Sequence, residues 1–595
     1  MPLKKLLALA LLPAGSLHAQ AVKLEVIYPE DGAVISSQKY ITCFGNVTPR
    51  TARVWIPDAK LKRYKDGVFV ARVPVQPGSF SFPVFARSQD TVSVVKTVFI
   101  RPGYFETNAG KLSIDSSLVW PEEDISAGAD QAIPLLVKGT VGSRAFYSIG
   151  DAHSWSPLKA LERRKQPEWG DAVFAEGIKP GLPAVNGLFW GVMEKMWRYQ
   201  STDELTVSYA LVAGTDTVYH RAPGRIRSRE FPVSAMMIEN SESVSREEKS
   251  FYTTYFSPRT AVKLLASAGG YYKVDLGNKE HAWLRQQSVI RVSSEEPTTR
   301  TQQINLTSRE TETELSLQFL FEGRVPYRIQ YQSNTALRLL LFTPSHKNYY
   351  LPPLTIETPG YEIKNVESNK GTIAVDVVSL QKSIWGFEAY YEKDSLKISI
   401  NKPPQIANPA RPLKGRTICL DAGHKPDTGS IGPRGRGEDE ITGVYVAALQ
   451  GLLEREGARV IVTHNNEMGA NLASRRILAQ LEKPDIFLSI HFNALPAAVN
   501  PFRNRGSSTY YYHPHSRLLA ETVHKAYTRR TGLRHFGTHY GNYHICRLTR
   551  APAVLLEPAF ITNPIEENKI FDPQFQKRLC RGIVEGLKLF FKRVR

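Results

Sequence analysis

Four residues in the C-terminal third of this 595-residue chain have the types and spacing needed for metal-assisted hydrolysis. His424, His491 and Glu557 each follow shortly after an apolar run, and Glu438 follows His424 after a glycine-rich loop. Two imidazoles and one carboxylate form a zinc site that leaves a position for water. A further carboxylate can then act as general base. A lone histidine at a strand end is more often structural, so the prediction depends on all four residues meeting at one place.

The surrounding sequence predicts elements that would bring these residues together. Short apolar runs predict strands at 416–420, 459–463, 486–490 and 553–556. Helical patterns follow at 442–455, 471–481, 516–530 and 573–593. This alternation predicts an α/β domain with a mainly parallel sheet. Because ligands bind beyond the carboxyl ends of such strands, His424, His491 and Glu557 should share one rim, to which the loop after the first strand can return Glu438.

Three motifs in this region resemble those of the zinc-dependent N-acetylmuramoyl-L-alanine amidases of the Amidase_3 (AmiC-like) family. They are Leu420–His424 with the downstream Glu438, Leu488–Ala494, and Pro552–Pro564. The match covers about 414–595, in order and with family-like spacing. It implies one Zn²⁺ per catalytic domain, held by His424, Glu438 and His491, with Glu557 as the catalytic carboxylate. It also implies hydrolysis of the amide between N-acetylmuramic acid and L-alanine of peptidoglycan, in wall remodelling or daughter-cell separation.

The sequence departs from the family pattern beside two of these residues. Lys425 and Pro426 stand where the family usually has two glycines. The second ligand is usually followed by Lys, whereas Glu438 is followed by Asp439 and Glu440, so Glu440 is an alternative ligand. Glu438 is preferred because its distance from Gly457, the turn before the next strand, fits the family.

Other residues near these motifs have less certain roles. Pro558 replaces a usual glycine, which affects the backbone beside Glu557 and not its identity. Asn493 and Arg475 are predicted to contact substrate, although Arg475 fits a structural role as well. Five more histidines are expected on the surface or near substrate rather than in a second metal site: His513, His515, His535, His539 and His544.

Upstream of the catalytic region the sequence predicts several small all-β modules. Short runs rich in Val, Ile, Tyr, Phe and Thr alternate with turn residues, and long helical patterns are hard to find. Asp66–Val70 and Pro77–Phe80 resemble the turns of an immunoglobulin-like sandwich, and Gly270–Gly277 with Ala282–Leu284 resembles a bacterial SH3-like barrel. The predicted domains are a signal peptide (1–21), an Ig-like sandwich (22–125), a β-rich module of unknown role (126–234), an SH3-like barrel (235–295), an AMIN-like β domain (300–402), a Pro-rich linker (403–413) and the zinc amidase domain (414–595).

The N-terminus and the composition narrow the cellular setting. Lys4 and Lys5, the apolar run 6–12 and the small residues at 19–21 predict a secretory signal peptide. The net charge of +19 favours an anionic partner. An exported basic chain is expected in the periplasm or cell envelope, with peptidoglycan rather than nucleic acid as that partner and no transmembrane anchor. The β modules are expected to bind wall material, or an envelope partner such as a protein activator.

Two other functions are compatible with the same residues. A zinc peptidase acting on peptidoglycan peptides could use the same metal set, and only the cleaved bond separates it from an amidase. A non-catalytic wall-binding protein could retain a vestigial catalytic domain. The four intact residues His424, Glu438, His491 and Glu557 argue against such decay.

Overall fold

The computed structural model describes most of the chain between residues 21 and 594. Outside the description are residues 1–20, 36–38, 101–110, 130, 151–153, 161–162, 165–183, 186, 194–203, 229–230, 244–253, 278–279, 294–300, 344–347, 370, 465–466, 498, 503–505 and 595. The predicted signal peptide therefore lies outside the described residues, except for Ala21. None of the helices in the described part is both long and apolar enough to cross a membrane.

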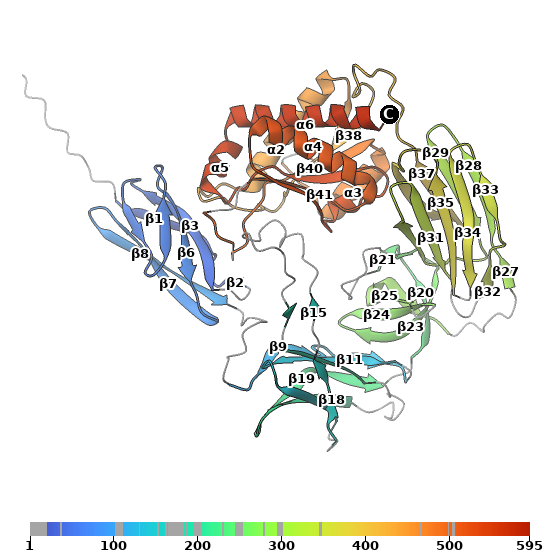
Figure 1. The fold of residues 1–595 in the computed structure, drawn as a ribbon, viewed down its shortest axis with the longest axis horizontal. Helices are drawn as coiled ribbons and strands as arrows, with labels where there is room; N and C mark the ends of the chain where they lie inside the picture. The colour runs from blue at the N-terminus through green and yellow to red at the C-terminus, as the bar shows by residue number, and fades with distance from the viewer. Residues whose placement is uncertain are drawn as a thin grey trace, which may run out of the picture.

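The first 80 or so described residues form a β-sandwich around its own apolar core (Figure 1). Its sheets have the orders β1-β3-β6-β5 and β2-β8-β7-β4. The strands are β1 (Lys23–Tyr28), β2 (Val34–Ile35), β3 (Tyr40–Thr48), β4 (Arg53–Trp55), β5 (Lys60–Arg63), β6 (Val68–Pro74), β7 (Gly78–Arg87) and β8 (Thr91–Ile100). The next strand already belongs to another sheet, so the described sandwich ends at Ile100 rather than at 125.

The middle region contains a long sheet and a smaller one that share a core. The smaller sheet has the order β14-β17-β11-β9. The long one runs β13-β12-β18-β19-β10-β23-β20-β26, with β24 paired to β23 and β25 paired to β24. The strands are β9 (Ile114–Trp120), β10 (Ile125–Ala127), β11 (Ile133–Gly139), β12 (Arg144–Ile149), β13 (Ser156–Pro157), β14 (Lys159–Ala160), β17 (Leu188–Met193), β18 (Glu204–Ala213), β19 (Asp216–Ser228), β20 (Val233–Met237), β23 (Ala261–Ala268), β24 (Tyr271–Gly277), β25 (Glu280–Arg285) and β26 (Val289–Arg291). A separate pair joins β15 (Arg163–Arg164) and β16 (Ala184–Val185). Strand β10 pairs with both β19 and β23, so one sheet crosses the predicted boundary at 234/235.

A second sandwich precedes the catalytic region and has the largest β-domain core in the described chain. Its sheets run β21-β22-β30-β31-β35-β34-β33 and β28-β29-β37-β36, with the pair β27-β32 beside them. The strands are β21 (Ser241–Glu242), β22 (Tyr255–Phe256), β27 (Thr301–Gln303), β28 (Asn305–Glu310), β29 (Glu314–Leu320), β30 (Tyr327–Tyr331), β31 (Ala336–Phe342), β32 (Asn348–Tyr350), β33 (Thr355–Glu357), β34 (Tyr361–Asn369), β35 (Thr372–Ser379), β36 (Gly386–Glu392) and β37 (Ser395–Asn401).

The C-terminal domain is a six-stranded sheet of order β39-β38-β40-β43-β41-β42 with helices on both faces. Its elements are β38 (Thr417–Ala422), α2 (Glu438–Arg455), β39 (Arg459–Val462), α3 (Leu472–Glu482), β40 (Ile486–Ile490), β41 (Ser507–Tyr511), α4 (Arg517–Thr531), β42 (His535–Tyr540), β43 (Ala553–Glu557), α5 (Pro564–Ile570) and α6 (Pro573–Arg593). Strands β38, β39, β40 and β43 run parallel, and β41 pairs antiparallel with β43. The prediction of a β-rich N-terminal region followed by a distinct catalytic domain is confirmed.

Alternate side chains of the central strands explain the two helical layers. Leu420, Leu488 and Leu556 pack in one core with α2, α4 and α6, whereas Cys419 and Phe487 pack with Ala479 of α3 on the other face. All these strand residues are buried. Strands covered on both faces read as unbroken apolar runs.

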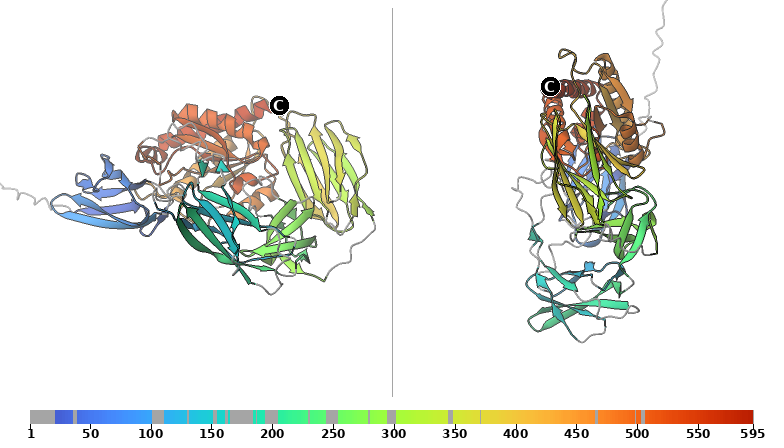
Figure 2. Two further views of the ribbon diagram at one scale, coloured as in Figure 1. Left: turned by 60° about the horizontal axis from the view of Figure 1, so that its bottom comes forward. Right: turned by 90° about the vertical axis from the view of Figure 1, so that its right-hand side faces the viewer.

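The β modules surround the C-terminal domain on more than one side (Figures 1 and 2). The N-terminal sandwich lies beside α5, and the sandwich of β28–β37 lies at the opposite side of the domain. Where the sandwich that precedes the C-terminal domain meets it, His513 and His515 are only 6% and 7% exposed and lie against Tyr331. The expectation that these two histidines lie on the surface or near substrate is therefore wrong, because the β sandwich covers them.

Candidate metal centre and active site

The strand register brings the ends of β38, β40 and β43 to one rim. Ala422 pairs with Ile490, and Ile490 pairs with Leu556. The ladder continues past the strands, since Gly423 N–H donates to Ile490 O (2.9 Å) and His491 N–H donates to Leu556 O (2.9 Å). His424, His491 and Glu557 therefore leave three adjacent strands at the same level.

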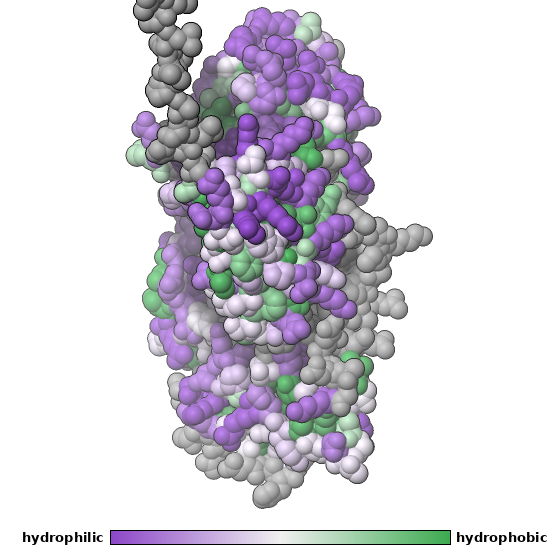
Figure 3. All heavy atoms as spheres, turned by 90° about the vertical axis from the view of Figure 1, so that its left-hand side faces the viewer, coloured by the Kyte–Doolittle hydropathy of each residue, from purple (hydrophilic) through white to green (hydrophobic). Residues whose placement is uncertain are grey.

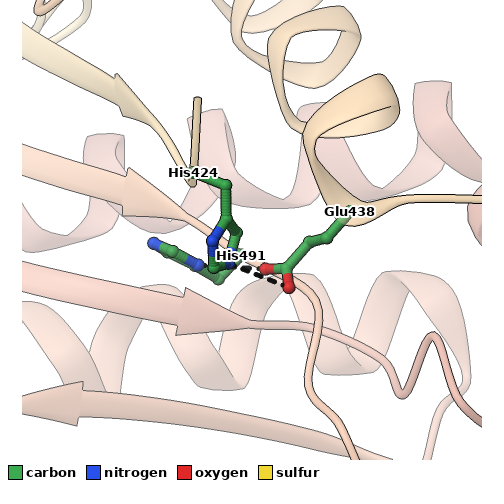
Figure 4. A group of neighbouring side chains, drawn as sticks. All are labelled: His424, Glu438 and His491. Atoms are coloured by element: carbon green, nitrogen blue, oxygen red, sulfur yellow. Dashed lines mark hydrogen bonds and ion pairs between the residues drawn. The ribbon is translucent and has the colours of Figure 1, made fainter. Parts of the chain in front are cut away.

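Glu438 completes a cluster with the two histidines (Figure 4). Its Oε2 lies 3.0 Å from Nε2 of His424, and its Oε1 lies 3.0 Å from Nδ1 of His491. One ligand atom from each of the three residues can be chosen so that all lie within 4.8 Å of one another. Figure 4 shows the carboxylate of Glu438 directed at both imidazole rings. Two neutral imidazoles and a carboxylate are the donor set of an open zinc site, so the residues fit that metal.

Glu438 and Glu440, the two candidate carboxylate ligands, have different contacts at the start of α2. Glu438 is the first residue of the helix, 2% exposed, and accepts backbone N–H groups of Ser430 (3.2 Å) and Phe492 (2.8 Å). Glu440 turns back to the helix end, where its Oε1 accepts Gly437 N–H (3.0 Å). A carboxylate at this position satisfies a free N–H group of the first turn. Glu440 thus caps the helix and is not part of the cluster.

The loop after β38 orients His424. Asp427 Oδ1 lies 2.6 Å from Nδ1 of His424 and also accepts Gly429 N–H (3.0 Å). This leaves Nε2 as the nitrogen facing Glu438, in the way that outer carboxylates orient ligating histidines. Gly429 has φ +63°, and a Cβ there would lie 2.4 Å from the His424 ring. A Cβ on Gly423 would likewise lie 2.5 Å from the His491 ring, so both glycines leave room for the imidazoles.

The charges in the cluster shift one another's pKa. Burial opposes ionisation of Glu438, but hydrogen bonds and charge from His424 and His491 outweigh it and hold the pKa of Glu438 well below its usual range. Burial lowers the pKa of His424, whereas contacts with Glu438 and Asp427 raise it, with a net pKa of about 9. The two shifts share one cause, which is the mutual attraction between the Glu438 carboxylate and the neighbouring imidazoles.

Glu557 lies beside this cluster as the last residue of β43. Burial, followed by the negative charge of Glu438, raises the pKa of Glu557 well above its ordinary value. Its Oε2 is buried and makes no hydrogen bond within the described part of the protein. A carboxylate that is not held by the protein and has a raised pKa is suited to exchange protons with a bound water or substrate.

A buried network supports the rim from below. Asp421, which is fully buried, accepts hydrogen bonds from Thr463 Oγ1 and Ser489 Oγ at 2.6 Å each, and from Arg475 at 3.2 Å. Arg475 is 2% exposed and also donates to the carbonyls of Ala470, Ala422, His424 and Lys425. Its guanidinium therefore holds the loop of His424 in place. The sequence signs of this network were the polar Asp421 directly after an apolar run and the structural role considered for Arg475.

We expect Arg475→Met to lower the free energy of unfolding by about 3–5 kcal/mol, because it leaves the buried Asp421 charge without its partner. Urea denaturation of the chain from residue 22 measures this change. Arg459→Met is the matched control, since the Arg459–Glu482 pair is exposed and worth at most about 1 kcal/mol. Equal, small losses for both variants would contradict the supporting role of Arg475.

Asn493 lies two residues beyond His491 at the same rim. Its backbone bridges to the segment after β43, with Asn493 N–H donating to Ala559 O (2.8 Å) and Ile561 N–H donating to Asn493 O (2.9 Å). The residue is 8% exposed, and its Nδ2 has no hydrogen-bond partner among the described residues. The Asn493 amide is buried near the cluster and beside Tyr510, whereas Arg475 is occupied by protein carbonyls.

Known proteins resemble this part of the chain. Residues 418–589 match the family model described as N-acetylmuramoyl-L-alanine amidase. A probable cell wall amidase, LytH of Staphylococcus aureus, is 37% identical over 183 residues, or 30% of this chain and 60% of the relative. The chain thus spans less than two thirds of the curated relatives that it matches.

Solved amidase structures cover the same region. The catalytic domain of CwlV from Bacillus (Paenibacillus) polymyxa var. colistinus is 31% identical, covering 29% of this chain and 97% of that one, with a TM-score of 0.28. An N-acetylmuramoyl-L-alanine amidase from Clostridium difficile 630 is 29% identical, covering 29% and 95%, also with a TM-score of 0.28. Residues 418–589 thus match the N-acetylmuramoyl-L-alanine amidase family model, and this stretch holds His424, Glu438, His491 and Glu557 at one rim of its sheet.

Proposed function

We propose that this chain hydrolyses the amide bond between N-acetylmuramic acid and L-alanine in peptidoglycan, with one zinc ion per catalytic domain. The observation that carries the proposal is the cluster of His424, Glu438 and His491 beside the buried, unpaired carboxylate oxygen of Glu557. The family match at 418–589 supports the choice of substrate.

The residues divide the chemistry between them. His424 Nε2, Glu438 and His491 Nδ1 would hold the metal, and Asp427 would keep the His424 ring in place. A zinc ion bound there lowers the pKa of water to about 7 and polarises a carbonyl oxygen. Glu557 accepts the proton of the attacking water and returns it to the departing alanine nitrogen. Asn493 is assigned a contact with substrate because it lies two residues beyond His491, and Arg475 fixes the loop rather than the substrate.

Export and wall binding complete the proposal. The predicted signal peptide at 1–21 and the wall substrate favour action in the periplasm or cell envelope. We assign binding of the wall, or of a protein partner, to the Ig-like, SH3-like and AMIN-like β modules. A protein activator is one candidate partner. Remodelling of the wall or separation of daughter cells would use such an activity.

Mass spectrometry of digested peptidoglycan tests the activity. The chain from residue 22 is incubated with purified peptidoglycan, with and without a zinc chelator. Free stem peptides that begin with alanine, lost on chelation, are the expected products. Cuts within the stem or cross-link would instead establish a zinc peptidase. Absence of products from a zinc-loaded chain would contradict the amidase and favour the non-catalytic wall-binding alternative.

His491→Ala should abolish tight zinc binding, because it removes one of three protein ligands and leaves only His424 beside Glu438. Metal content after dialysis, measured by plasma mass spectrometry, is expected to fall from one zinc per chain to near zero. His535→Ala is the control, since His535 is exposed on β42 and outside the cluster. Zinc retained by His491→Ala would remove this residue from the ligand set.

A further inference from the structure

The N-terminal sandwich contacts the loop that follows His491. Thr42 of β3 donates its N–H to Ala497 O (2.9 Å) and its hydroxyl to Val499 O (3.1 Å). The side chain of Ala497 packs against the apolar core of the sandwich. Lys60 lies over the ring of Phe502, with Nζ 5.9 Å from its centroid. Backbone hydrogen bonds, apolar packing and a cation–π contact thus join the sandwich to the segment leaving His491.

The same sandwich contacts the loop that leads to Glu438. Asp66 Oδ2 accepts Nε of Arg434 at 2.9 Å and also contacts Nη2. Arg434 continues the network to the catalytic domain, with its Nη1 bonded to Pro564 O (3.0 Å) and to the carboxylate of Glu567. Ile27 lies 3.8 Å from the position that a Cβ on Gly435 would occupy. Arg434 and Gly435 belong to the loop between His424 and Glu438.

The part of this network within the catalytic domain is buried, whereas its Asp66 end is exposed. Glu567 is fully buried and has Arg434 and Arg436 as its cationic partners, while Arg434 is only 16% exposed. The side chain of Asp66 is 42% exposed, and burial raises its pKa, but the hydrogen bond and charge of Arg434 outweigh burial and lower it. Asp66 is therefore ionised and adds a second anchor to an arginine that is already fixed to α5.

From these contacts we infer that the N-terminal sandwich is a positioning module for the metal centre. It holds the loop before Glu438 and the loop after His491 at the same time, although it lies more than 300 residues away in sequence. Loops position ligands less precisely than strands and helices do, and a shift of about 1 Å can cost about a hundredfold in rate. This inference rests on the proposed amidase function for its activity readout, and hydrogen exchange tests it independently.

Figure 3 shows the molecule from the side on which the N-terminal sandwich lies. On the face in Figure 3, hydrophobic residues are scattered among hydrophilic ones. Apolar residues scattered in this way are ordinary on a protein surface. The specific contacts of Asp66, Thr42 and Ala497 are instead directed at the catalytic domain.

The test compares two double variants of the chain from residue 22. Asp66→Ala with Thr42→Val removes the anchor on Arg434 and the hydroxyl bond to Val499 with little change in side-chain volume at 42. Asp90→Ala with Thr91→Val is the control, since both residues are exposed at the edge of the same sandwich. Hydrogen exchange of peptides covering 429–437 and 491–497, zinc affinity, and kcat/KM on peptidoglycan are measured for each.

In the test variant, faster exchange in both loops and a fall of about tenfold or more in kcat/KM are expected, with exchange in β6 unchanged. Asp66→Glu with native Thr42 should restore most of the activity, because it keeps a carboxylate for Arg434. Unchanged exchange in the loops, or faster exchange with full activity, would overturn the inference. If the native chain cleaves no peptidoglycan, the proposed function fails, while the exchange data still decide whether the sandwich orders the loops.

Discussion

Glu557→Gln is expected to lower kcat on peptidoglycan by about 10²–10⁴-fold while zinc content and stability stay close to native. The substitution keeps the shape of the side chain but removes its capacity to take and return a proton. Zinc binding should persist because Glu557 lies outside the cluster of His424, Glu438 and His491. The free energy of unfolding should not fall, because the change removes a carboxylate that burial and the Glu438 charge disfavour.

Turnover, metal content and urea denaturation measured on one preparation separate the roles at the site. Glu521→Gln is a suitable control, since this glutamate forms an exposed pair with Arg517. Loss of zinc from Glu557→Gln would move this residue into the ligand set. Near-native turnover would show that another group carries the proton.

The arrangement of three site residues could be predicted from the sequence because it depends on strand ends. His424, His491 and Glu557 follow apolar runs that form adjacent parallel strands, so one geometric rule places them together. The position of Glu438 was less certain, because the apolar spacing indicated a helix only from Thr442. The helix begins four residues earlier, where an acidic first turn and the Glu440 side chain stabilise its N-terminus.

Most contacts of the supporting residues could not be predicted, because the partners are distant in the sequence. Asp421 lies inside β38, although a charged residue normally ends a predicted buried strand, and hydrogen bonds from Thr463, Ser489 and Arg475 satisfy it. Asp427 is close to His424 in sequence, but no motif in the sequence indicated that its carboxylate contacts the His424 ring. The contact of Asp66 with Arg434 spans 368 residues, which no local pattern reports.

The domain boundaries show the same limit. Local turn and strand patterns predicted separate modules on either side of residue 234, yet β10 joins strands from both sides into one sheet. Pairing of this kind depends on which strand edges meet, and strand composition does not encode it. The roles of these modules as Ig-like, SH3-like and AMIN-like domains stay predictions.

The β sandwich before the catalytic domain inserts a tryptophan into the catalytic core. Trp385, between β35 and β36, is 5% exposed and belongs to the core formed by α2, α4 and α6. Its ring centroid lies 5.4 Å from that of Phe590 and 6.0 Å from that of Phe591, and its Nε1 donates to Asp485 O (2.8 Å). The next residue, Gly386, approaches so closely that a Cβ would lie 2.3 Å from Arg550 O. The sandwich therefore completes the catalytic core rather than resting on it.

We expect Trp385→Ala to lower the free energy of unfolding of the catalytic domain by about 3–5 kcal/mol, through lost apolar contact and the cavity left beside α6. Far-UV circular dichroism in urea reports this domain, since the α-helices described in the structure all lie between 438 and 593. Trp155→Ala is the matched control, because Trp155 is 40% exposed and belongs to another module. Similar small losses for both variants would mean that the catalytic core is complete without the sandwich. A large loss for Trp385→Ala alone would mean that a fragment beginning after the linker lacks part of its own core, so that its inactivity would report instability rather than the absence of an amidase.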